Sequence, residues 1–218
     1  MKKILWTMVF LAVAAVAQAE LLVVPNASFE LPDTATYDFE IADWGNPGNT
    51  GVFANMAGYS HWITNADGDQ MAFMSCDAGN PDNNLYMDLG YMLESGKTYT
   101  LTVGVAARSD SVPGDSANTK MELRLFTRVP ELTILASQEV VYSDLSSTEL
   151  TYYSATLNAV DIPVGSIGQG FGIWLDSTVG TGGDWTLDNV TLTMVPEPAT
   201  MLLLGLGGLG LLKRRSER

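Results

Sequence analysis

Tyr99-Thr100-Leu101-Thr102-Val103-Gly104-Val105 is the stretch that decides the fold of this 218-residue chain. Its large apolar residues occupy every second position, so an extended segment here has one apolar face and one polar face. Met121-Glu122-Leu123-Arg124-Leu125-Phe126 repeats the pattern with charged residues on the polar face. This period of two predicts β-strands that cover a core with one face and meet water with the other.

Short runs of the same kind continue along the body of the chain, separated by Gly, Asn, Asp and Pro. No amphipathic helix longer than two turns is apparent between them. Roughly ten strands with turn signals between them predict an all-β fold, an antiparallel β-sandwich. The other predicted strands are residues 21–24, 59–63, 70–75, 85–89, 132–142, 151–157, 171–175 and 185–194.

Three breaks in the pattern predict local features. Glu94-Ser95-Gly96-Lys97 is the sharpest turn signal, and residues 176–184, with three glycines, predict a longer flexible loop. In the last strand, Asp188-Asn189 puts the alternation out of step, which predicts a β-bulge.

The N-terminal segment predicts export. Met1-Lys2-Lys3 forms a positive head, residues 4–16 are mostly apolar, and Ala17-Gln18-Ala19 is a small-x-small site. This order is typical of a helical signal peptide, which signal peptidase would cleave between Ala19 and Glu20. The apolar run is shorter than the roughly 20 residues of a membrane span.

The C-terminal segment places a short apolar run between prolines and a basic cluster. Pro196-Glu197-Pro198 ends any strand or helix that reaches it, because proline fixes φ and lacks an N–H donor. Residues 199–212 are uncharged and rich in Leu and Gly, and Lys213-Arg214-Arg215 follows. We expect a short hydrophobic helix with its basic end in the cytoplasm. About 14 apolar residues suit a temporary stay in the bilayer better than a permanent span.

These C-terminal features together resemble the PEP-CTERM sorting signal of Gram-negative bacteria. The resemblance implies that an exosortase, an integral-membrane cysteine-protease-like enzyme, recognises the tail and removes or exchanges it during export. The precursor would be membrane-inserted, and the processed protein would reach the cell surface or the extracellular polysaccharide matrix. The expected organisation is a signal peptide at 1–19, a β-sandwich domain at 20–195 and a sorting tail at 196–218.

The body of the chain is strongly acidic. Residues 20–195 carry 5 basic and 23 acidic side chains, a formal charge of −18. Nucleic acid is excluded as an expected partner, because phosphate binding needs a basic face. Cys76 is the only cysteine, so no intrachain disulfide forms, and we expect a small buried hydrophobic side chain there.

Three further motifs resemble carbohydrate-binding-module-like, galactose-binding-like jelly rolls. They are Pro25-Asn26-Ala27-Ser28-Phe29-Glu30 near the N-terminus, Leu93-Glu94-Ser95-Gly96-Lys97-Thr98-Tyr99-Thr100-Leu101, and Leu187-Asp188-Asn189-Val190-Thr191-Leu192 in the last strand. The resemblance implies a jelly-roll sandwich. Its family contains sugar binders, adhesins and modules without a known ligand, so the fold alone does not fix the function.

The same resemblance implies a structural Ca²⁺ between Glu30 and Asp188, for which hydrogen bonding in a turn or bulge is the open alternative. Calcium prefers six to eight oxygen ligands. Asn65-Ala66-Asp67-Gly68-Asp69 adds Asp67 and Asp69 as candidate ligands, although it lacks the spacing of an EF-hand loop. A plain β-turn is the alternative for this segment.

Sugar binding would need exposed aromatic side chains that stack on pyranose rings. The candidates for binding a polysaccharide are Trp44, Tyr59, Trp62, Tyr86 and Tyr91. Trp174 and Trp185 lie inside predicted strands and are expected in the core. Core packing is the alternative for Trp44.

The sequence predicts no enzyme. His61 is the only histidine, and no G-x-S-x-G sequence surrounds a serine. We therefore expect an exported, non-catalytic protein of the surface or extracellular matrix, with polysaccharide binding left open. A glycan-cleaving enzyme of jelly-roll fold, with two carboxylates as its catalytic pair, is the alternative.

Overall fold

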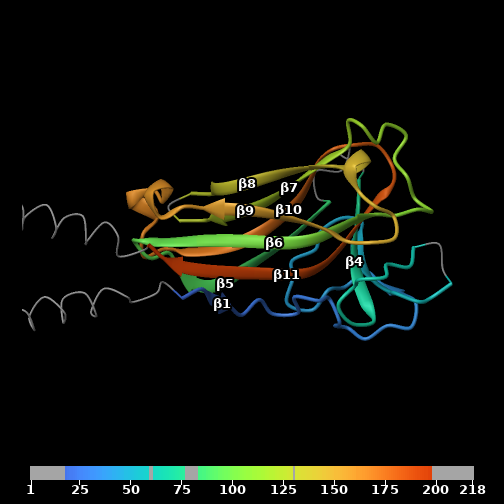
Figure 1. Cartoon of the computed structure of the whole chain (residues 1–218), viewed down its shortest axis with the longest axis horizontal. Coiled ribbons are helices and arrows are strands. Elements are labelled where there is room, and N and C mark those ends of the chain that lie inside the picture. Colours follow the sequence, from blue (N-terminus) through green and yellow to red (C-terminus); the bar gives the residue numbers. More distant parts are fainter. Residues whose placement is uncertain (1–17, 59–60, 77–82, 130, 198–218) are drawn as a thin grey trace, which may run out of the picture.

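The computed structural model describes residues 18–58, 61–76, 83–129 and 131–197, and within them eleven strands form two antiparallel sheets (Figure 1). The predicted signal-peptide and C-terminal helices lie outside these residues. No helix in the described part of the chain is long and apolar enough to cross a membrane. The strands are β1 (Glu20–Leu22), β2 (Tyr37–Asp38), β3 (Thr50–Ala54), β4 (Gln70–Ser75), β5 (Asn84–Met92), β6 (Lys97–Ala107), β7 (Lys120–Thr127), β8 (Thr133–Val141), β9 (Thr151–Leu157), β10 (Gly170–Val179) and β11 (Asp184–Pro196).

The two sheets lie face to face, which confirms the predicted antiparallel sandwich. The larger sheet has the order β2-β3-β4-β11-β6-β9, with β1 also paired to β11, and the smaller has the order β5-β10-β7-β8. In Figure 1, β6 and β11 run side by side along the molecule, with β7 and β8 above them. Three short 3₁₀ helices, η1 (Tyr142–Asp144), η2 (Ala159–Asp161) and η3 (Val164–Ser166), connect strands.

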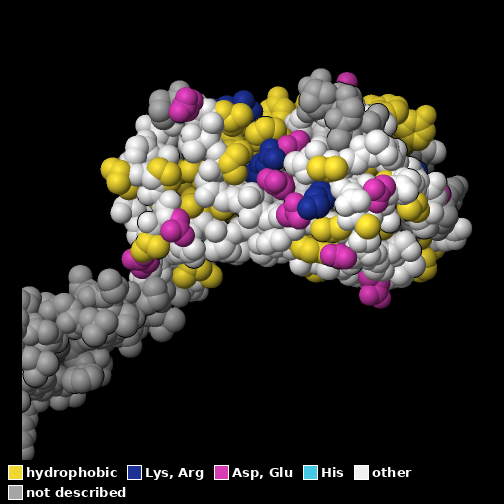
Figure 2. Space-filling model, turned by 90° about the horizontal axis from the view of Figure 1, so that it is seen from above, with side chains coloured by type: hydrophobic (Ala, Val, Ile, Leu, Met, Phe, Trp, Pro, Cys, Tyr) yellow, Lys and Arg dark blue, Asp and Glu magenta, His cyan; other side chains and the backbone are white. Residues whose placement is uncertain are grey.

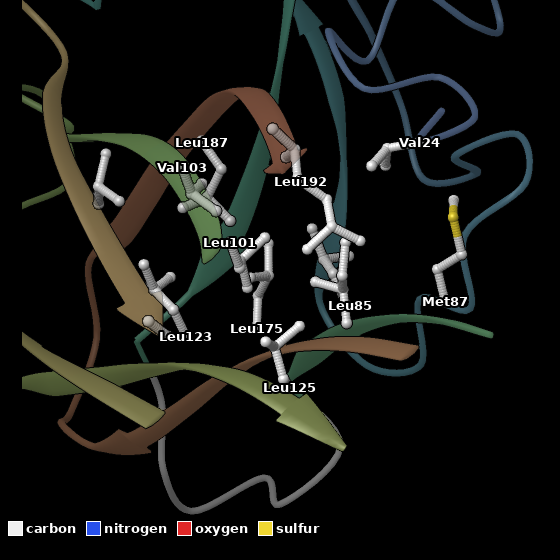
Figure 3. Packing of buried hydrophobic residues seen from close by; sticks show 14 of the residues in the cluster. Val24, Leu85, Met87, Leu101, Val103, Leu123, Leu125, Leu175, Leu187 and Leu192 are labelled. Carbon is white, nitrogen blue, oxygen red and sulfur yellow. The ribbon is translucent and has the colours of Figure 1, made fainter. Parts of the chain in front are cut away.

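The core between the sheets follows from the period of two in the sequence. Tyr99, Leu101, Val103 and Val105 are each at most 1% exposed, and so is Trp185. Facing leucines of the smaller sheet complete this core. Figure 3 shows side chains of the two sheets pointing toward each other: Leu101, Val103, Leu187 and Leu192 from the larger sheet and Leu85, Leu123, Leu125 and Leu175 from the smaller. Cys76 is also buried, as predicted.

Strand β11 changes partners at the predicted bulge. One of its edges pairs with β6, while the other pairs with β4 over Asp184–Leu187 and with β1 near Leu192. The register shifts between Asp188 and Thr191, and Asn189 has a left-handed φ of 51°. Asp188 therefore lies where β11 passes from one neighbour to the other.

Some boundaries differ from the sequence predictions. A strand was predicted over 59–63, but residues 61–63 form turn and irregular structure, and β2 and β3 were not predicted. All five residues of β3 are buried, because a second apolar cluster covers the outer side of the sheet there. A strand buried on both faces has no period of two. The predicted loop 176–184 is also shorter, since β10 continues to Val179.

Candidate functional site

A cleft of about 450 Å³ opens on the outer side of the larger sheet, over β2, β3 and β4. One wall of this cleft is aromatic and is formed by Tyr37, Phe39, Phe53 and Phe73. The ring centroids of Tyr37 and Phe39 lie 5.5 Å apart, and those of Phe39 and Phe73 lie 5.9 Å apart, both edge to face. The wall is therefore a continuous row of rings, of which Tyr37 and Phe39 are more than half exposed.

A glycine makes room for this aromatic wall. Gly51 in β3 lies opposite Phe73 in β4. A Cβ atom at Gly51 would lie 2.7 Å from the Phe73 ring and 2.1 Å from the carbonyl oxygen of Asp38. Both distances are shorter than any ordinary contact, so a larger residue would push β2 and the Phe73 ring apart.

A charged wall adjoins the aromatic one. Arg108 donates from Nε to Asp110 Oδ1 over 2.7 Å and from Nη1 to Asp184 Oδ2 over 3.4 Å. His61 Nδ1 lies 3.3 Å from Asp110 Oδ2. The guanidinium of Arg108 also lies 5.3 Å from the centroid of the Phe53 ring, so it joins the charged wall to the aromatic wall.

The hydroxyl of Tyr142 positions both Arg108 and Asp184 from beneath the cleft. It accepts a hydrogen bond from the N–H of Arg108 at 2.9 Å and lies 3.1 and 3.2 Å from the carbonyl oxygens of Arg108 and Asp184. The Tyr142 ring packs on Trp185 with centroids 5.0 Å apart. Burial raises the pKa of Tyr142 to about 12. The hydroxyl is therefore neutral, and its hydrogen bonds link the backbone of Arg108 and Asp184 to a ring packed in the core.

Only a small part of this cleft was predicted from the sequence. His61 was named as the single histidine without a site role, and Arg108, Asp184 and the aromatic wall were not selected. These residues come from separate strands and loops, and none stands in a recognisable motif. The sequence signal that was available is the spacing of Tyr37 and Phe39 on alternate positions in a segment rich in Asp and Glu.

Of the predicted sugar-binding aromatics within the described residues, Trp44 and Trp62 do not line the cleft. Trp44 is 5% exposed and packs on Phe29 with ring centroids 5.3 Å apart, so its assignment as a glycan ligand was wrong. The physical reason is that Gly45 exchanges backbone hydrogen bonds with Tyr86, which turns Trp44 into the sandwich. Trp62 is 42% exposed but is absent from the cleft lining, and Tyr59 lies outside the described residues.

A second aromatic surface lies on the outer face of the smaller sheet. Arg124 stacks 4.8 Å from the centroid of Trp174, and Arg128 lies 5.1 Å from the centroids of both Tyr86 and Phe126. A hollow of about 210 Å³ adjoins these rings. Trp174 is thus on the outer face of β10, and its predicted place in the core was wrong, while Trp185 is in the core as predicted.

Within the described residues, Arg108, Lys120, Arg124 and Arg128 each pair with an acidic side chain. Arg124 donates to Glu122 over 2.8 Å and also to Asp176, and Arg128 donates to Asp88 over 3.3 Å. Figure 2 shows dark blue Lys and Arg side chains next to magenta acidic ones on the face that it presents.

The predicted calcium ligands gather at the β11 bulge. Asp188 Oδ2 accepts from the N–H of Asp67 over 2.7 Å, and Glu30 Oε1 accepts from the N–H groups of Asp69 and Gln70 over 3.1 and 3.0 Å. Gly68 lies against Glu30, where a Cβ would come within 2.4 Å of Oε1. Glu30, Asp67, Asp69 and Asp188 therefore lie close together in the fold.

The carboxylate oxygens of Glu30 and Asp188, however, accept from backbone amides, and Asp67 Oδ2 accepts from the hydroxyl of Ser28 over 2.9 Å. Among the described residues no three Asp, Glu, His or Cys side chains are arranged to hold a metal ion together. The residues as placed do not fit a calcium centre, and calcium binding stays a prediction. Burial raises the pKa of Asp188 to about 7, the charges of Asp67 and Glu30 add to the rise, and hydrogen bonds from the N–H groups of Asp67 and Asn189 oppose it.

Comparison with known proteins gives two family matches. A family model described as HpiC1 cyclase, of the HpiC1-like family, matches residues 20–193. A model described as the PEP-CTERM protein-sorting motif matches residues 195–216 and confirms the predicted sorting tail. No curated protein matches the chain.

Solved structures share the fold. The Stig cyclase Fisc from Fischerella sp. TAU, in complex with (3Z)-3-(1-methyl-2-pyrrolidinylidene)-3H-indole, is 21% identical with a TM-score of 0.64, over 83% of this chain and 100% of that chain. A cyclase from Fischerella sp. TAU in complex with 4-(1H-indol-3-yl)butan-2-one is 19% identical with a TM-score of 0.63, over 82% and 98% of the two chains. The CBM22-1 xylan-binding domain of Paenibacillus barcinonensis Xyn10C is 14% identical with a TM-score of 0.50, over 84% and 99%. At these identities the likeness establishes the jelly-roll fold alone.

Proposed function

The chain belongs to the HpiC1-like family over residues 20–193 and carries a PEP-CTERM sorting motif. We propose that it is an exported, non-catalytic saccharide-binding protein. Its ligand would be a segment of extracellular polysaccharide. The observation that carries the proposal is the cleft of about 450 Å³ in which an aromatic wall adjoins a charged wall.

The two walls suit the two kinds of surface that a sugar ring presents. The C–H faces of a pyranose are apolar and stack on aromatic rings such as Tyr37 and Phe39. The hydroxyl edge needs directed donors and acceptors, and Arg108 with Asp184 supplies both at once. Such pairs discriminate between sugars, because a hydroxyl in the wrong place leaves a partly buried charge without its partner.

The predicted destination supports the same ligand class. The sorting motif implies export and processing by an exosortase, which would place the mature domain at the cell surface. A xylan-binding domain shares the fold at a TM-score of 0.50. The aromatic surface around Trp174, Tyr86 and Arg124 supplies a second place where an extended glycan would lie.

An enzyme of the cyclase type is the second candidate, because the family model is described as HpiC1 cyclase. Two of the structural neighbours hold indole compounds, and an aromatic wall suits a flat ring as well as a sugar. In this chain the carboxylate of Asp184 lines the cleft and would be the candidate acid or base of such a reaction. One of its oxygens accepts a hydrogen bond from Arg108. A glycan-cleaving reaction would use the same carboxylate with Asp110.

A binding experiment tests the leading proposal. We expect the domain comprising residues 20–197 to bind one glycan on an array with micromolar affinity. Phe39→Ala should weaken this binding by about tenfold, since it removes one stacking ring worth about 1–2 kcal/mol. Trp62→Ala is the matched control, because Trp62 is exposed but lies away from the cleft lining, and it should bind like the wild type.

Turnover decides between binding and catalysis. Conversion of an indole-bearing substrate or hydrolysis of a polysaccharide, abolished by Asp184→Asn, would replace the binding proposal with an enzyme. If glycan binding is unchanged in Phe39→Ala and weaker in Trp62→Ala, the glycan binds outside the cleft.

A further inference from the structure

The last strand of the sandwich continues into the sorting motif without a linker. β11 ends at Pro196, the first proline of the Pro-Glu-Pro sequence, and Pro196 lies opposite Lys97 of β6. The next residue, Glu197, donates its backbone N–H to the carbonyl oxygen of Gly96 over 2.8 Å. The first two residues of the motif are therefore part of the folded domain.

Proline is compatible with this strand because the sheet does not need its N–H. In an antiparallel ladder, the N–H groups of alternate residues point to the same neighbour. The N–H of Glu197 points to β6, so the nitrogen of Pro196 points to the opposite edge of β11. Within the described residues that edge has its last strand partner at Met194, which pairs with Glu20. Pro196 consequently costs no ladder hydrogen bond.

The turn that receives Glu197 is anchored in the core. Gly96 has a φ of 72°, a left-handed conformation that glycine adopts at low cost. The N–H of Glu94, in the same turn, donates to the hydroxyl of Tyr99 over 2.9 Å. Tyr99 is 1% exposed, and its ring lies 5.0 Å from that of Phe171. The carbonyl of Gly96 is thus held by a rigid support.

We propose that the processing enzyme cuts the chain on the C-terminal side of Glu197, so that the mature protein keeps the whole of β11. Enzymes that cut peptides bind them extended, with the backbone available for new hydrogen bonds. The backbone of β11 is already paired, with β6 on one side and, at Met194, with β1 on the other. A cut before Pro196 would need this strand to leave the sheet, at the cost of local unfolding.

The chemistry of the cut is acyl transfer. When water is the acceptor, the carbonyl carbon of the cut bond gains the water oxygen and the leaving nitrogen gains a proton. The inference rests on the proposed sorting by an exosortase, and it adds the place of the cut. It also assigns the Glu94–Gly96 turn as the part of the domain that holds the motif.

Mass spectrometry of the processed protein tests the inference. The full chain is expressed in a bacterium that makes an exosortase, and the C-terminal peptide of the mature protein is sequenced. We expect it to end at Glu197 or later, and an end at Pro196 or earlier would overturn the inference while leaving sorting intact. A chain that keeps its full tail would refute the sorting proposal itself, and this inference with it.

A deletion tests whether the fold sets the limit. Removal of residues 194 and 195 draws the Pro-Glu-Pro sequence two positions further into the ladder with β6 and keeps the nitrogen of Pro196 on the edge away from β6. We expect processing of this variant to slow by about tenfold, because several strand pairs must open first. The matched control carries Gly-Ser in place of the two deleted residues, which restores the distance, and it should be processed like the wild type. Equal rates for the deletion and its control would contradict the inference.

Discussion

The titration of Asp188 offers the most direct quantitative test of the structure. Its carboxyl group is fully buried at the β11 bulge, and burial raises its pKa from an ordinary value of 3.8 to about 7. Below pH 4 both the folded and the unfolded chain hold the proton. Between pH 4 and pH 7 the unfolded chain loses it while the folded chain keeps it. The free energy of unfolding therefore decreases as the pH rises through this window.

The size of the effect follows from the pKa shift. One pKa unit corresponds to about 1.4 kcal/mol, and integration from pH 5 to pH 8 gives a loss of about 2–3 kcal/mol. Asp188→Asn removes this titration but keeps the shape of the side chain. It also leaves one of the two backbone N–H donors, from Asp67 or Asn189, without its acceptor, and that cost does not vary with pH.

Urea denaturation followed by tryptophan fluorescence measures the difference. In the presence of a chelator, we expect the stability of Asp188→Asn relative to the wild type to improve by about 2–3 kcal/mol between pH 5 and pH 8. Asp33→Asn is the control, since Asp33 is exposed, and its difference from the wild type should stay constant. An Asp188→Asn difference that is equal at pH 5 and pH 8 would refute the reasoning.

The same experiment with added Ca²⁺ examines the calcium prediction. A cation bound beside Asp188 would favour the ionised carboxylate, so the wild type would regain stability at pH 8 in proportion to the calcium concentration. Asp188→Asn would lose this response. If calcium changes neither protein, then the carboxylates of Glu30 and Asp188 act only as acceptors for the backbone amides of the 67–70 loop.

Two further predictions concern the cleft. Tyr142→Phe should lower the free energy of unfolding by about 1–3 kcal/mol, because the N–H of Arg108 loses its acceptor. Urea denaturation measures this loss, and an unchanged free energy of unfolding would show that the hydroxyl is dispensable. Gly51→Ala should weaken glycan binding by at least about tenfold through displacement of the Phe73 ring. Gly114→Ala is the control, because a Cβ there meets open space, and it should bind the glycan like the wild type. Isothermal titration calorimetry measures both affinities, and equal affinities of the two variants would contradict the role of Gly51.

The sequence by itself determined the features that depend on local periodicity. The alternation over Tyr99–Val105 fixes which residues of β6 face the core, because successive side chains of a strand point to opposite faces. The break at Asp188-Asn189 is equally local and correctly predicted the bulge. The sorting tail was also predicted from the sequence, since its Pro-Glu-Pro sequence, apolar run and basic cluster follow one another along the chain.

The tertiary structure alone decided the cleft and the fate of the tryptophans. Residues as distant as Tyr37, Arg108 and Asp184 meet because β2, β6 and β11 belong to one sheet, and no local pattern specifies which strands become neighbours. Trp44 looked like a loop residue but is buried by a backbone bridge to β5, and Trp174 looked like core but faces outward. Strand pairing depends on long-range contacts throughout the core. The periodicity therefore predicted the two layers but not the cleft on the outer side of the larger sheet.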